Sequence, residues 1–373
     1  MIVGILKEVK SEENRVSMTP AGVEVMRQHG HTVLVEKNAG AKSGLSDDAY
    51  TAAGAQIVDQ ASEIFRQADM IMHVKEPQPC EYGLIRQGQI IFTYLHLAAD
   101  FEQAQALIKS QSIDIAYETI QKEDGSLPLL TPMSEVAGRM AIQQGAKYLE
   151  MPQGGHGLLL GGVPGVDPGT VLVIGGGVVG THAAKMACGL GAKVYLLDMN
   201  LERLRYLSDV MPSNCILLMS SPAMIRKLVK QSDVVVGAVL VVGTRAPKLV
   251  NREMLATMKK GSVLVDVAID QGGCFETSRA TTHGDPTFTV DGIVHYCVAN
   301  MPGAVAKTST FALANATLPY AVEIADKGWL RAMQENKEIR MGANVINGRV
   351  TYKGVAEAFD MPYTSIEKMI SEL

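Results

Sequence analysis

Aromatic residues and cysteines are scarce in this chain of 373 residues. Phenylalanine, tryptophan and tyrosine together make up 5%, whereas apolar residues of all kinds make up 47%, so its hydrophobic cores must be mainly aliphatic. The five cysteines are far apart, odd in number and without a CxxC pair: Cys80, Cys188, Cys215, Cys274 and Cys297. This spacing argues against a disulfide framework and a zinc site, and it favours a reducing cytoplasm.

An excess of positive charge is also missing. The formal net charge is -5 and the pI is near 5.9, which disfavours a general binder of nucleic acid or of anionic membranes. No apolar run approaches the roughly 20 residues that a membrane span needs, and the N-terminal segment becomes charged at Lys7 and Glu8. We therefore expect a cytoplasmic protein without a secretion signal, a membrane anchor or a nucleic-acid partner.

The length predicts two globular domains, because a domain usually has about 100 to 200 residues. In the N-terminal part, short β-rich runs alternate with amphipathic stretches, which is typical of a parallel sheet covered by helices. Helices are expected from Pro20 to His29 and from Asp100 onward. The expected strands are 2–6, 32–36, 70–74, 90–94 and 113–117.

A second α/β block follows a break at 125–128. Thr131-Pro132 favours a helix start, and the helix is expected to run to about Leu149 between the two blocks. Residues 154–169, rich in glycine and proline, predict a loop. Six further strands are expected at 171–174, 193–197, 215–219, 233–236, 262–267 and 293–298. The tail from Ser309 is helical in pattern and too short for a domain, so we expect it to fold back onto the first block.

A glycine-rich fingerprint follows the strand expected at 171–174. In Gly175-Gly-Gly177-Val178-Val179-Gly180, the G-x-G-x-x-G spacing falls between a strand and a helix that runs to about Leu190. Gly175 is expected to allow the tight turn, Gly177 the approach of a pyrophosphate, and Gly180 the packing of the helix on the strand. The amides at the helix start then face the phosphates, which predicts binding of a dinucleotide.

An acidic residue closes the next expected strand. Asp198 stands eighteen residues after Gly180, where a carboxylate accepts hydrogen bonds from ribose hydroxyls. Such an acid repels a 2′-phosphate and favours NAD over NADP, although Arg203 and Arg205 lie nearby. The alternative is an ordinary glycine-rich turn with Asp198 as a strand-end residue.

These patterns predict an α/β fold of two doubly wound, Rossmann-like domains with parallel sheets. The substrate (catalytic) domain is expected at 1–130 plus 307–373, and the NAD-binding domain at 131–306. The substrate and NAD sites are expected in the cleft between them.

Four polar residues follow expected strands, where open α/β sheets bind ligands: Arg15, Lys75, His96 and Asp270. Two cations, an imidazole and a carboxylate suit the oxidation of a small anionic substrate. Each residue also has a plainer interpretation. Arg15 could be a solvated loop charge, Lys75 a partner of Glu76, His96 part of an apolar wall, and Asp270 a turn residue. His73 could be a core or a surface residue.

Five longer motifs carry a resemblance that covers nearly the whole chain. They are KEVKSEENRVSMTP at 7–20, TYLHLA at 93–98, PMSEVAGR at 132–139, DVAIDQGGCFETSR at 266–279 and VANMPGAV at 298–305. With them the chain resembles the bacterial L-alanine dehydrogenases, within the alanine dehydrogenase and pyridine nucleotide transhydrogenase family.

The resemblance implies roles for the four candidates. Arg15 and Lys75 would hold the substrate carboxylate and polarise its keto oxygen, with His96 and Asp270 as the catalytic acid–base pair. No metal is expected, since Lys327 stands where some relatives carry a metal-linked histidine; Ala306-Lys307 also departs from the family pattern. With the glycines, the NAD-binding residues would be Ser134, Gly175, Gly177, Val178, Val179, Gly180, Asp198, Arg203, Ser220, Val239, Leu240, Val267, Ala268, Ile269, Arg279, Val298, Ala299, Asn300 and Met301.

The activity implied is the reversible oxidative deamination of L-alanine to pyruvate and ammonium, a reaction of L-alanine catabolism. A hydride would pass from the substrate Cα to NAD⁺, and the resulting imine would be hydrated. Glyoxylate could be a further substrate, and the resemblance implies a cytoplasmic homohexamer. Two alternatives stay open: an NAD(H)-binding hydride-transfer domain like a transhydrogenase α-subunit, and a non-catalytic NAD-binding protein.

Overall fold

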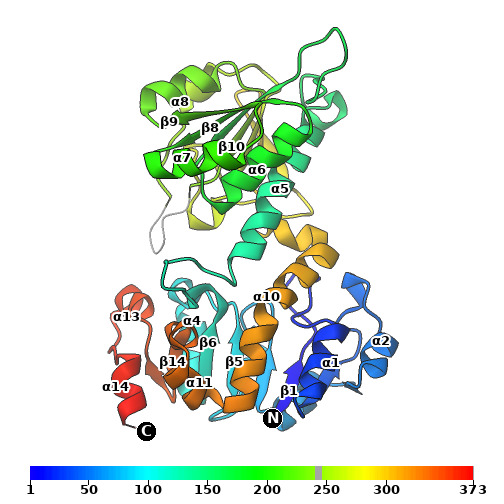
Figure 1. The fold of residues 1–373 in the computed structure, drawn as a ribbon, viewed down its shortest axis with the longest axis vertical. Helices are drawn as coiled ribbons and strands as arrows, with labels where there is room; N and C mark the ends of the chain where they lie inside the picture. The colour runs from blue at the N-terminus through cyan, green and yellow to red at the C-terminus, as the bar shows by residue number, and fades with distance from the viewer. Residues whose placement is uncertain (240–245, 373) are drawn as a thin grey trace. The chain divides into compact units, whose positions relative to one another are not determined.

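The computed structural model describes residues 1–239 and 246–372 and divides into two compact units. The first unit contains Met1–Met133 and the tail from Val305, and the second contains Ser134–Ala304. The chain enters the second unit within helix α5 (Thr131–Tyr148) and leaves it within the 3-10 helix η7 (Met301–Val305). Each unit is built on one β-sheet with helices packed against it (Figure 1).

The first sheet has eight strands in the order β15-β14-β6-β5-β4-β1-β2-β3. Strands β1 to β6 are all parallel and run 3-2-1-4-5-6, which is the order of a doubly wound sheet. Two strands of the tail extend this sheet, because β14 pairs antiparallel with β6 and β15 antiparallel with β14. The strands are β1 (Ile2–Ile5), β2 (Thr32–Glu36), β3 (Gln56–Val58), β4 (Met70–Met72), β5 (Ile90–Thr93), β6 (Ile113–Ala116), β14 (Ala343–Ile346) and β15 (Arg349–Val350).

Helices of the first unit begin at capping residues that can be read in the sequence. The Thr19 side chain accepts from the amide of Gly22 at the start of α1, and Asp100 accepts from Gln103 at the start of α4. The helices are α1 (Pro20–Gln28), α2 (Asp47–Ala52), α3 (Ala61–Gln67), α4 (Phe101–Ser110), α10 (Ala306–Lys327), α11 (Trp329–Glu335), α12 (Lys337–Met341), α13 (Lys353–Phe359) and α14 (Ile366–Ser371). Within the described residues, no helix has both the length and the apolar character needed to cross a membrane.

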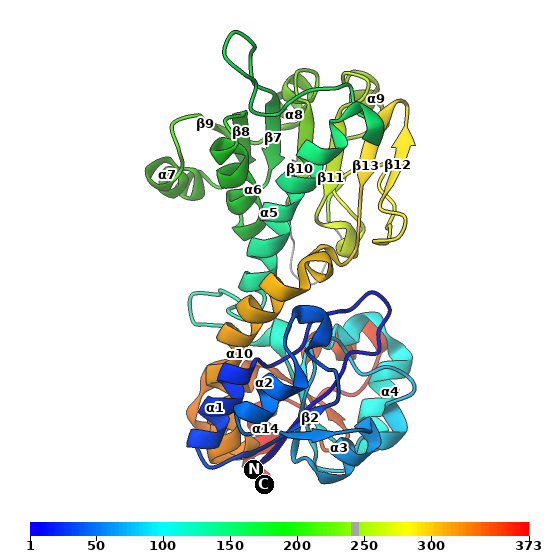
Figure 2. The same ribbon diagram turned by 90° about the vertical axis from the view of Figure 1, so that its right-hand side faces the viewer.

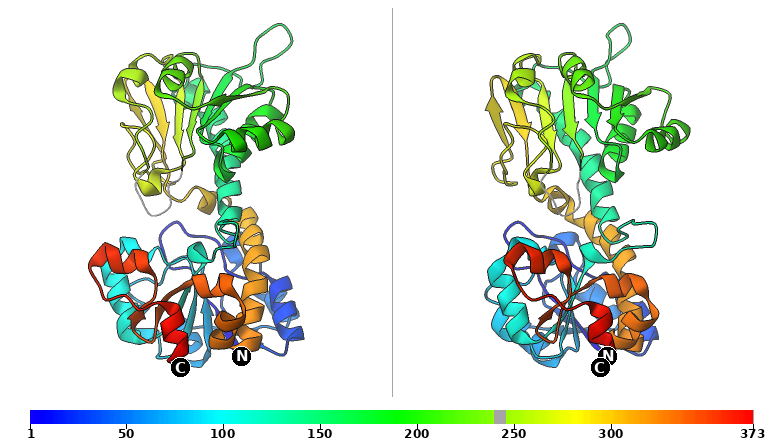
Figure 3. Two further views of the ribbon diagram at one scale, coloured as in Figure 1. Left: turned by 60° about the vertical axis from the view of Figure 1, so that its left-hand side comes forward. Right: turned by 90° about the vertical axis from the view of Figure 1, so that its left-hand side faces the viewer.

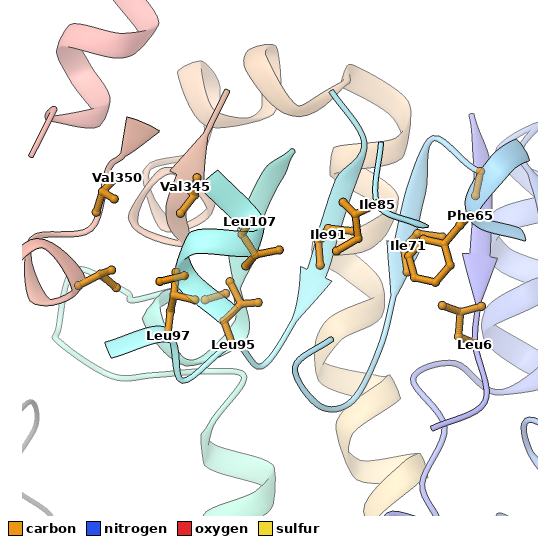
Figure 4. Packing of buried hydrophobic residues seen from close by; sticks show 14 of the residues in the cluster. Leu6, Phe65, Ile71, Ile85, Ile91, Leu95, Leu97, Leu107, Val345 and Val350 are labelled. Atoms are coloured by element: carbon orange, nitrogen blue, oxygen red, sulfur yellow. The ribbon is translucent and has the colours of Figure 1, made fainter. Parts of the chain in front are cut away.

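One hydrophobic cluster joins the tail to the rest of the first unit. Its buried side chains lie in a row that Figure 4 follows from Leu6 and Ile71 through Ile91 to Val345. Each fully buried aliphatic side chain of this size contributes about 1.5 to 3 kcal/mol. The tail therefore completes the core as well as the sheet, and Figure 3 shows it against the N-terminal strands.

The second sheet has seven strands in the order β12-β13-β11-β10-β7-β8-β9 (Figure 2). Without β12, its six parallel strands also run 3-2-1-4-5-6. The strands are β7 (Thr170–Ile174), β8 (Lys193–Asp198), β9 (Cys215–Met219), β10 (Val234–Gly237), β11 (Val263–Asp266), β12 (Thr287–Val290) and β13 (Ile293–Tyr296). The helices are α6 (Val178–Gly189), α7 (Leu201–Val210), α8 (Pro222–Val229) and α9 (Arg252–Ala256).

The predicted α/β class with two Rossmann-like units and parallel sheets is confirmed, and each mostly parallel sheet also has an antiparallel edge. Two edge hairpins were missed: β12 with β13, and β14 with β15. Their two-residue turns are Asp291-Gly292 and Asn347-Gly348, all four residues with positive φ. Such turns join antiparallel strands directly, so these strands need no crossover helix. The three-residue strand β3 was also missed.

Candidate active site

Three of the four candidate residues follow neighbouring strands of the first sheet. The order of this sheet reverses between β1 and β4, which pair with each other, and β5 lies beside β4. Arg15 follows β1, Lys75 follows β4, and His96 follows β5. In doubly wound sheets, ligands bind beyond the carboxyl ends of the strands at this reversal. The first unit therefore gathers two cations and an imidazole at its expected ligand-binding edge.

Arg15 is buried and is held by a neighbouring carboxylate. Its side chain is 2% exposed, and Nε and Nη2 donate to Glu13 Oε1 and Oε2 at 2.7 and 2.5 Å. Its Nη1 donates to Met133 Sδ at 3.1 Å. Burial alone would lower the pKa of Arg15, but the hydrogen bond and charge of Glu13 outweigh it and raise the pKa. Arg15 is a fixed cation rather than a solvated loop charge.

Lys75 is partly buried beside this guanidinium. Burial, and then the positive charge of Arg15, lower the pKa of the Lys75 ammonium. The Lys75 amide donates to Glu8 Oε2 at 3.3 Å, and its carbonyl accepts from Thr93 Oγ1 at 2.8 Å. Glu76 forms its ion pair with Lys10, so the plainer interpretation, a pair with Glu76, does not describe Lys75.

His96 is held in the left-handed backbone region at φ 47° and ψ 36°, which is uncommon outside glycine. Glu118 holds the turn, because its Oε1 accepts from the His96 amide at 2.6 Å. The ring stacks on Tyr94 with centroids 5.8 Å apart and planes 7° apart, and the side chain is 49% exposed. His96 is therefore an oriented, accessible imidazole and not part of a buried wall.

Asp270 lies in the second unit, exposed in the 3-10 helix η6 (Ile269–Gln271) that follows β11. A buried carboxylate organises its loop: Asp266 accepts from the amides of Cys274 and Phe275 at 3.1 and 3.2 Å. Burial raises the pKa of Asp266. Gly273 closes the loop at φ 78°, where a Cβ would lie 2.6 Å from Asp266 Oδ2. The shape of the loop that carries Asp270 thus depends on Asp266.

The glycine loop of the second unit connects β7 to α6. A Cβ on Gly180 would lie 1.7 Å from the Gly175 carbonyl oxygen, so helix and strand approach too closely for any side chain. Gly175 has φ 105° and would also clash, with the carbonyl of Ala238. At Gly177, by contrast, a Cβ would meet no atom within 4 Å. The space above Gly177, at the first turn of α6, suits a phosphate group.

Asp198 lies at the end of β8 beside this loop. Its Oδ2 accepts from the Gly176 amide at 2.7 Å and its Oδ1 from the Asn200 amide at 2.8 Å. A carboxylate has further lone pairs, so it can also accept from hydroxyl groups. Arg203 donates from Nε to the Gly176 carbonyl at 2.7 Å and lies 4.9 Å from the centre of the Tyr206 ring. Arg205 pairs with Glu202 instead. The loop, Asp198 and Arg203 form a cradle that fits the pyrophosphate and ribose of a dinucleotide.

The other predicted cofactor-binding residues follow strands of the second sheet, apart from Ser134 in α5. Arg279 is exposed and lies 4.3 Å from the centre of the Phe288 ring, and the Asn300 carbonyl accepts from His283. Leu240 lies outside the described residues. Those that follow β9, β10, β11 and β13 are Ser220, Val239, Val267, Ala268, Ile269, Val298, Ala299, Asn300 and Met301.

Sequence reasoning missed the carboxylates that hold these candidates: Glu8, Glu13, Glu118 and Asp266. Three of them could have been found by the same rule that selected Arg15, because Glu8 and Glu118 follow strands and Asp266 ends one. Glu13 offered no signal beyond being two residues from Arg15. In residues 1–239 and 246–372, no three His, Cys, Asp or Glu side chains are grouped so that they could hold a metal ion.

A dinucleotide cradle on one doubly wound unit, with buried cations and an imidazole on another, defines an α/β oxidoreductase of the nucleotide-dependent class. Family models for the N-terminal and C-terminal domains of alanine dehydrogenase/PNT match residues 4–137 and 141–353. The chain therefore belongs to the alanine dehydrogenase/PNT family.

Relatives match over the full length. The chain is 55% identical to an alanine dehydrogenase of Methanococcus maripaludis over 373 residues, which is all of both proteins. It is 54% identical over 371 residues to one of Staphylococcus saprophyticus, covering 99% of this chain and 100% of the relative. A solved L-alanine dehydrogenase superposes with a TM-score of 0.94 at 49% identity, covering 96% of this chain and 99% of that one. A transhydrogenase from Sinorhizobium meliloti, at TM-score 0.81 and 24% identity, covers 95% and 99% and shares the fold.

Proposed function

We propose that this protein is an NAD-dependent L-alanine dehydrogenase, which deaminates L-alanine reversibly to pyruvate and ammonium. The observation that carries the proposal is the buried Arg15, with Lys75 and His96, at the reversal point of the first sheet. The names of the full-length relatives supply the substrate. NAD would be held by the glycine loop and Asp198, and when bound it takes the hydride from the substrate Cα.

Arg15 and Lys75 bind and polarise the substrate. A guanidinium offers N–H donors in the planar arrangement that a carboxylate accepts, and Glu13 fixes its orientation before substrate arrives. Lys75, whose pKa is lowered by burial and by Arg15, donates to the keto oxygen of pyruvate. Because both cations come from the same edge of one sheet, they can bind the carboxylate and the keto oxygen of a small 2-oxo acid at the same time.

His96 and Asp270 move protons and order the nitrogen. Hydration of the imine gives a carbinolamine, which needs a proton taken from its hydroxyl and one given to its nitrogen. An imidazole can do both in the physiological pH range. The hydrogen bond from the His96 amide to Glu118 and the stacking on Tyr94 orient the ring for this transfer. Asp270 contributes a carboxylate that binds the ammonium group and orders the attacking water.

The same proposal extends to organisation and assembly. We assign residues 1–130 and 307–373 to the substrate domain and 131–306 to the NAD-binding domain. We further propose that the protein is a cytoplasmic homohexamer. Light scattering of the purified protein tests the assembly, since a hexamer has six times the chain mass of 40.0 kDa.

The activity is tested by mixing purified protein with NADH, ammonium and pyruvate and following NADH absorbance. Oxidation that requires both pyruvate and ammonium is the expected result, and NADPH should support it poorly. Glyoxylate and 2-oxoglutarate in place of pyruvate measure substrate breadth. If NADH binds but is oxidised only by a second nucleotide, the protein exchanges hydride as a transhydrogenase does. If no oxidant is reduced, it is a binding protein and the proposal fails.

A further inference from the structure

His73 is a buried histidine that the proposed reaction does not use. It follows β4 directly, two residues before Lys75, and is 1% exposed. Each ring nitrogen faces a carboxylate, with Nδ1 3.2 Å from Glu8 Oε1 and Nε2 3.2 Å from Glu81 Oε1. The two glutamate side chains are only 3% and 4% exposed. His73, Glu8 and Glu81 thus form a buried triad of ionisable side chains. Its histidine lies close in sequence to Lys75, one of the two proposed substrate-binding cations.

The two carboxylates beside the ring favour a protonated histidine. Nδ1 donates a hydrogen bond to Glu8 Oε1, whereas Nε2 and Glu81 Oε1 make an ion-pair contact with no hydrogen bond between them. A buried imidazole flanked by two carboxylates is stabilised in its charged form. Burial alone would lower the pKa of His73, but Glu8 and Glu81 outweigh it and raise the pKa to about 10. Glu36, which accepts from the Lys7 amide at 2.8 Å, adds a further carboxylate near the ring. His73 is therefore a cation in the interior of the first unit.

Glu8 connects this cation to the backbone of Lys75. Its Oε1 accepts from the Val74 amide at 2.6 Å, and its Oε2 accepts from the Lys75 amide at 3.3 Å. Both amides lie beyond the last ladder pairs of β4, which end at Met72. A buried carboxylate that loses its cation is strongly destabilised and moves toward water or takes up a proton. The position of the Glu8 carboxylate therefore depends on the charge of His73. The position of the backbone that carries the Lys75 side chain depends on it in turn.

We propose that His73 is a positioning residue for Lys75: it holds Glu8 in the interior, and Glu8 fixes the backbone from which Lys75 reaches the substrate. This inference rests on the proposed function, in which Lys75 binds the keto acid. His73 acts through Glu8 and the backbone rather than on the substrate itself.

The test compares three variants in the reaction of NADH, ammonium and pyruvate. His73→Gln removes the cation but keeps a polar side chain, and His73→Lys restores a cation. His295→Gln is the matched control, because His295 is also buried and bonds Thr277 Oγ1 at 2.7 Å, but in the second unit.

His73→Gln should raise the KM for pyruvate about tenfold or more, as expected for losing one charged hydrogen bond. The KM for NADH should stay within twofold, His73→Lys should recover most of the loss, and His295→Gln should leave the KM for pyruvate unchanged.

A folded His73→Gln variant with an unchanged KM for pyruvate would overturn the inference, as would an equal rise of both KM values. Hydrogen exchange of residues 73–76 tests it without activity. The Val74 and Lys75 amides should exchange faster in His73→Gln than in wild type and His295→Gln, and equal exchange rates would refute the role of Glu8. If the wild-type protein shows no turnover, the proposed function is refuted instead. The hydrogen-exchange rates then still decide whether His73 holds Glu8 and the backbone at Lys75 in place. If His73→Gln does not fold, Glu81→Gln is used in both measurements, with a smaller change expected.

Discussion

The two sheets of this protein have the same winding order but opposite chemistry at their carboxyl edges. The edge of the first sheet carries charged side chains that are held by buried carboxylates, as Arg15 is by Glu13. The edge of the second carries backbone amides and glycines, with Asp198 as the chief charged group beside the glycine loop. The winding decides where a ligand can bind, because it brings strand ends together. The loop residues decide which ligand it is.

The contrast has a physical reason. A small charged substrate offers few atoms, so it must be recognised by strong fixed charges, and these need partners that keep them in place without water. A dinucleotide offers a long phosphate chain, which backbone amides at a helix start can bind if no side chain intervenes. Ion pairs therefore shape the first edge, whereas the absence of side chains shapes the glycine loop of the second.

If His96 at the first edge transfers the protons of the carbinolamine, removing its imidazole should have the largest effect on kcat. His96→Ala is expected to lower kcat by about 10² to 10⁴, the usual contribution of a general acid–base group. Steady-state kinetics from pH 6 to 10 measure it. His29→Ala is the control, since His29 lies in the same unit with a 43% exposed side chain, and it should change kcat by less than twofold. Near-normal turnover and an unchanged pH profile in His96→Ala would remove the acid–base assignment.

The second edge is tested by replacing two glycines with alanine, at positions that differ in the space around the added Cβ. Gly180→Ala places a Cβ 1.7 Å from the Gly175 carbonyl oxygen and should destabilise the fold by about 1 to 3 kcal/mol or more. Gly177→Ala adds its Cβ in open space, so it should fold normally but raise the KM for NADH about tenfold by crowding the phosphate. Denaturant unfolding and NADH kinetics measure both effects. Equal effects of the two substitutions on stability would contradict this division of roles.

The buried histidine of the first edge predicts that the free energy of unfolding depends on pH. The pKa of His73 is raised from 6.5 to about 10, so between these values the folded state keeps a proton that the unfolded state has lost. The stabilisation is complete below pH 6.5 and declines by about 1.4 kcal/mol per pH unit up to about pH 10. Urea unfolding of wild type and His73→Gln from pH 6.5 to 9.5 should show wild type losing stability relative to the variant. Parallel curves would mean that His73 is not charged in the fold.

Cofactor choice gives the smallest expected effect and sharpens the account of the second edge. Asp198→Ser removes a charge that repels a 2′-phosphate and leaves Arg203 beside the glycine loop. The kcat/KM with NADPH divided by the kcat/KM with NADH should rise about tenfold or more. Asp209→Ser, on an exposed position of α7, is the control and should leave the ratio unchanged. An unchanged ratio in Asp198→Ser would mean that Asp198 does not select the cofactor.

Much of the fold could be predicted from local patterns. The parallel strands of both sheets, except β3, lie where β-rich runs alternate with helical stretches, and the caps Thr19 and Asp100 mark the helix starts. The edge hairpins were missed although Asp291-Gly292 and Asn347-Gly348 are strong turn signals, because a helical pattern dominates the tail around the second. His73 could not be assigned, since its environment comes from segments far apart in the chain.

The sequence by itself determined the fold class, the dinucleotide fingerprint and the residues that follow each strand, because these depend on short-range spacing and periodicity. Only the tertiary structure decided which of these residues are charged, buried and oriented. Arg15 became a fixed cation through Glu13, whereas Glu118 and Glu8 hold the backbone amides of His96 and Lys75. The physical reason is that burial and pairing set the charge state and geometry of a side chain, and both arise when strand ends that are distant in sequence meet at one edge of a sheet.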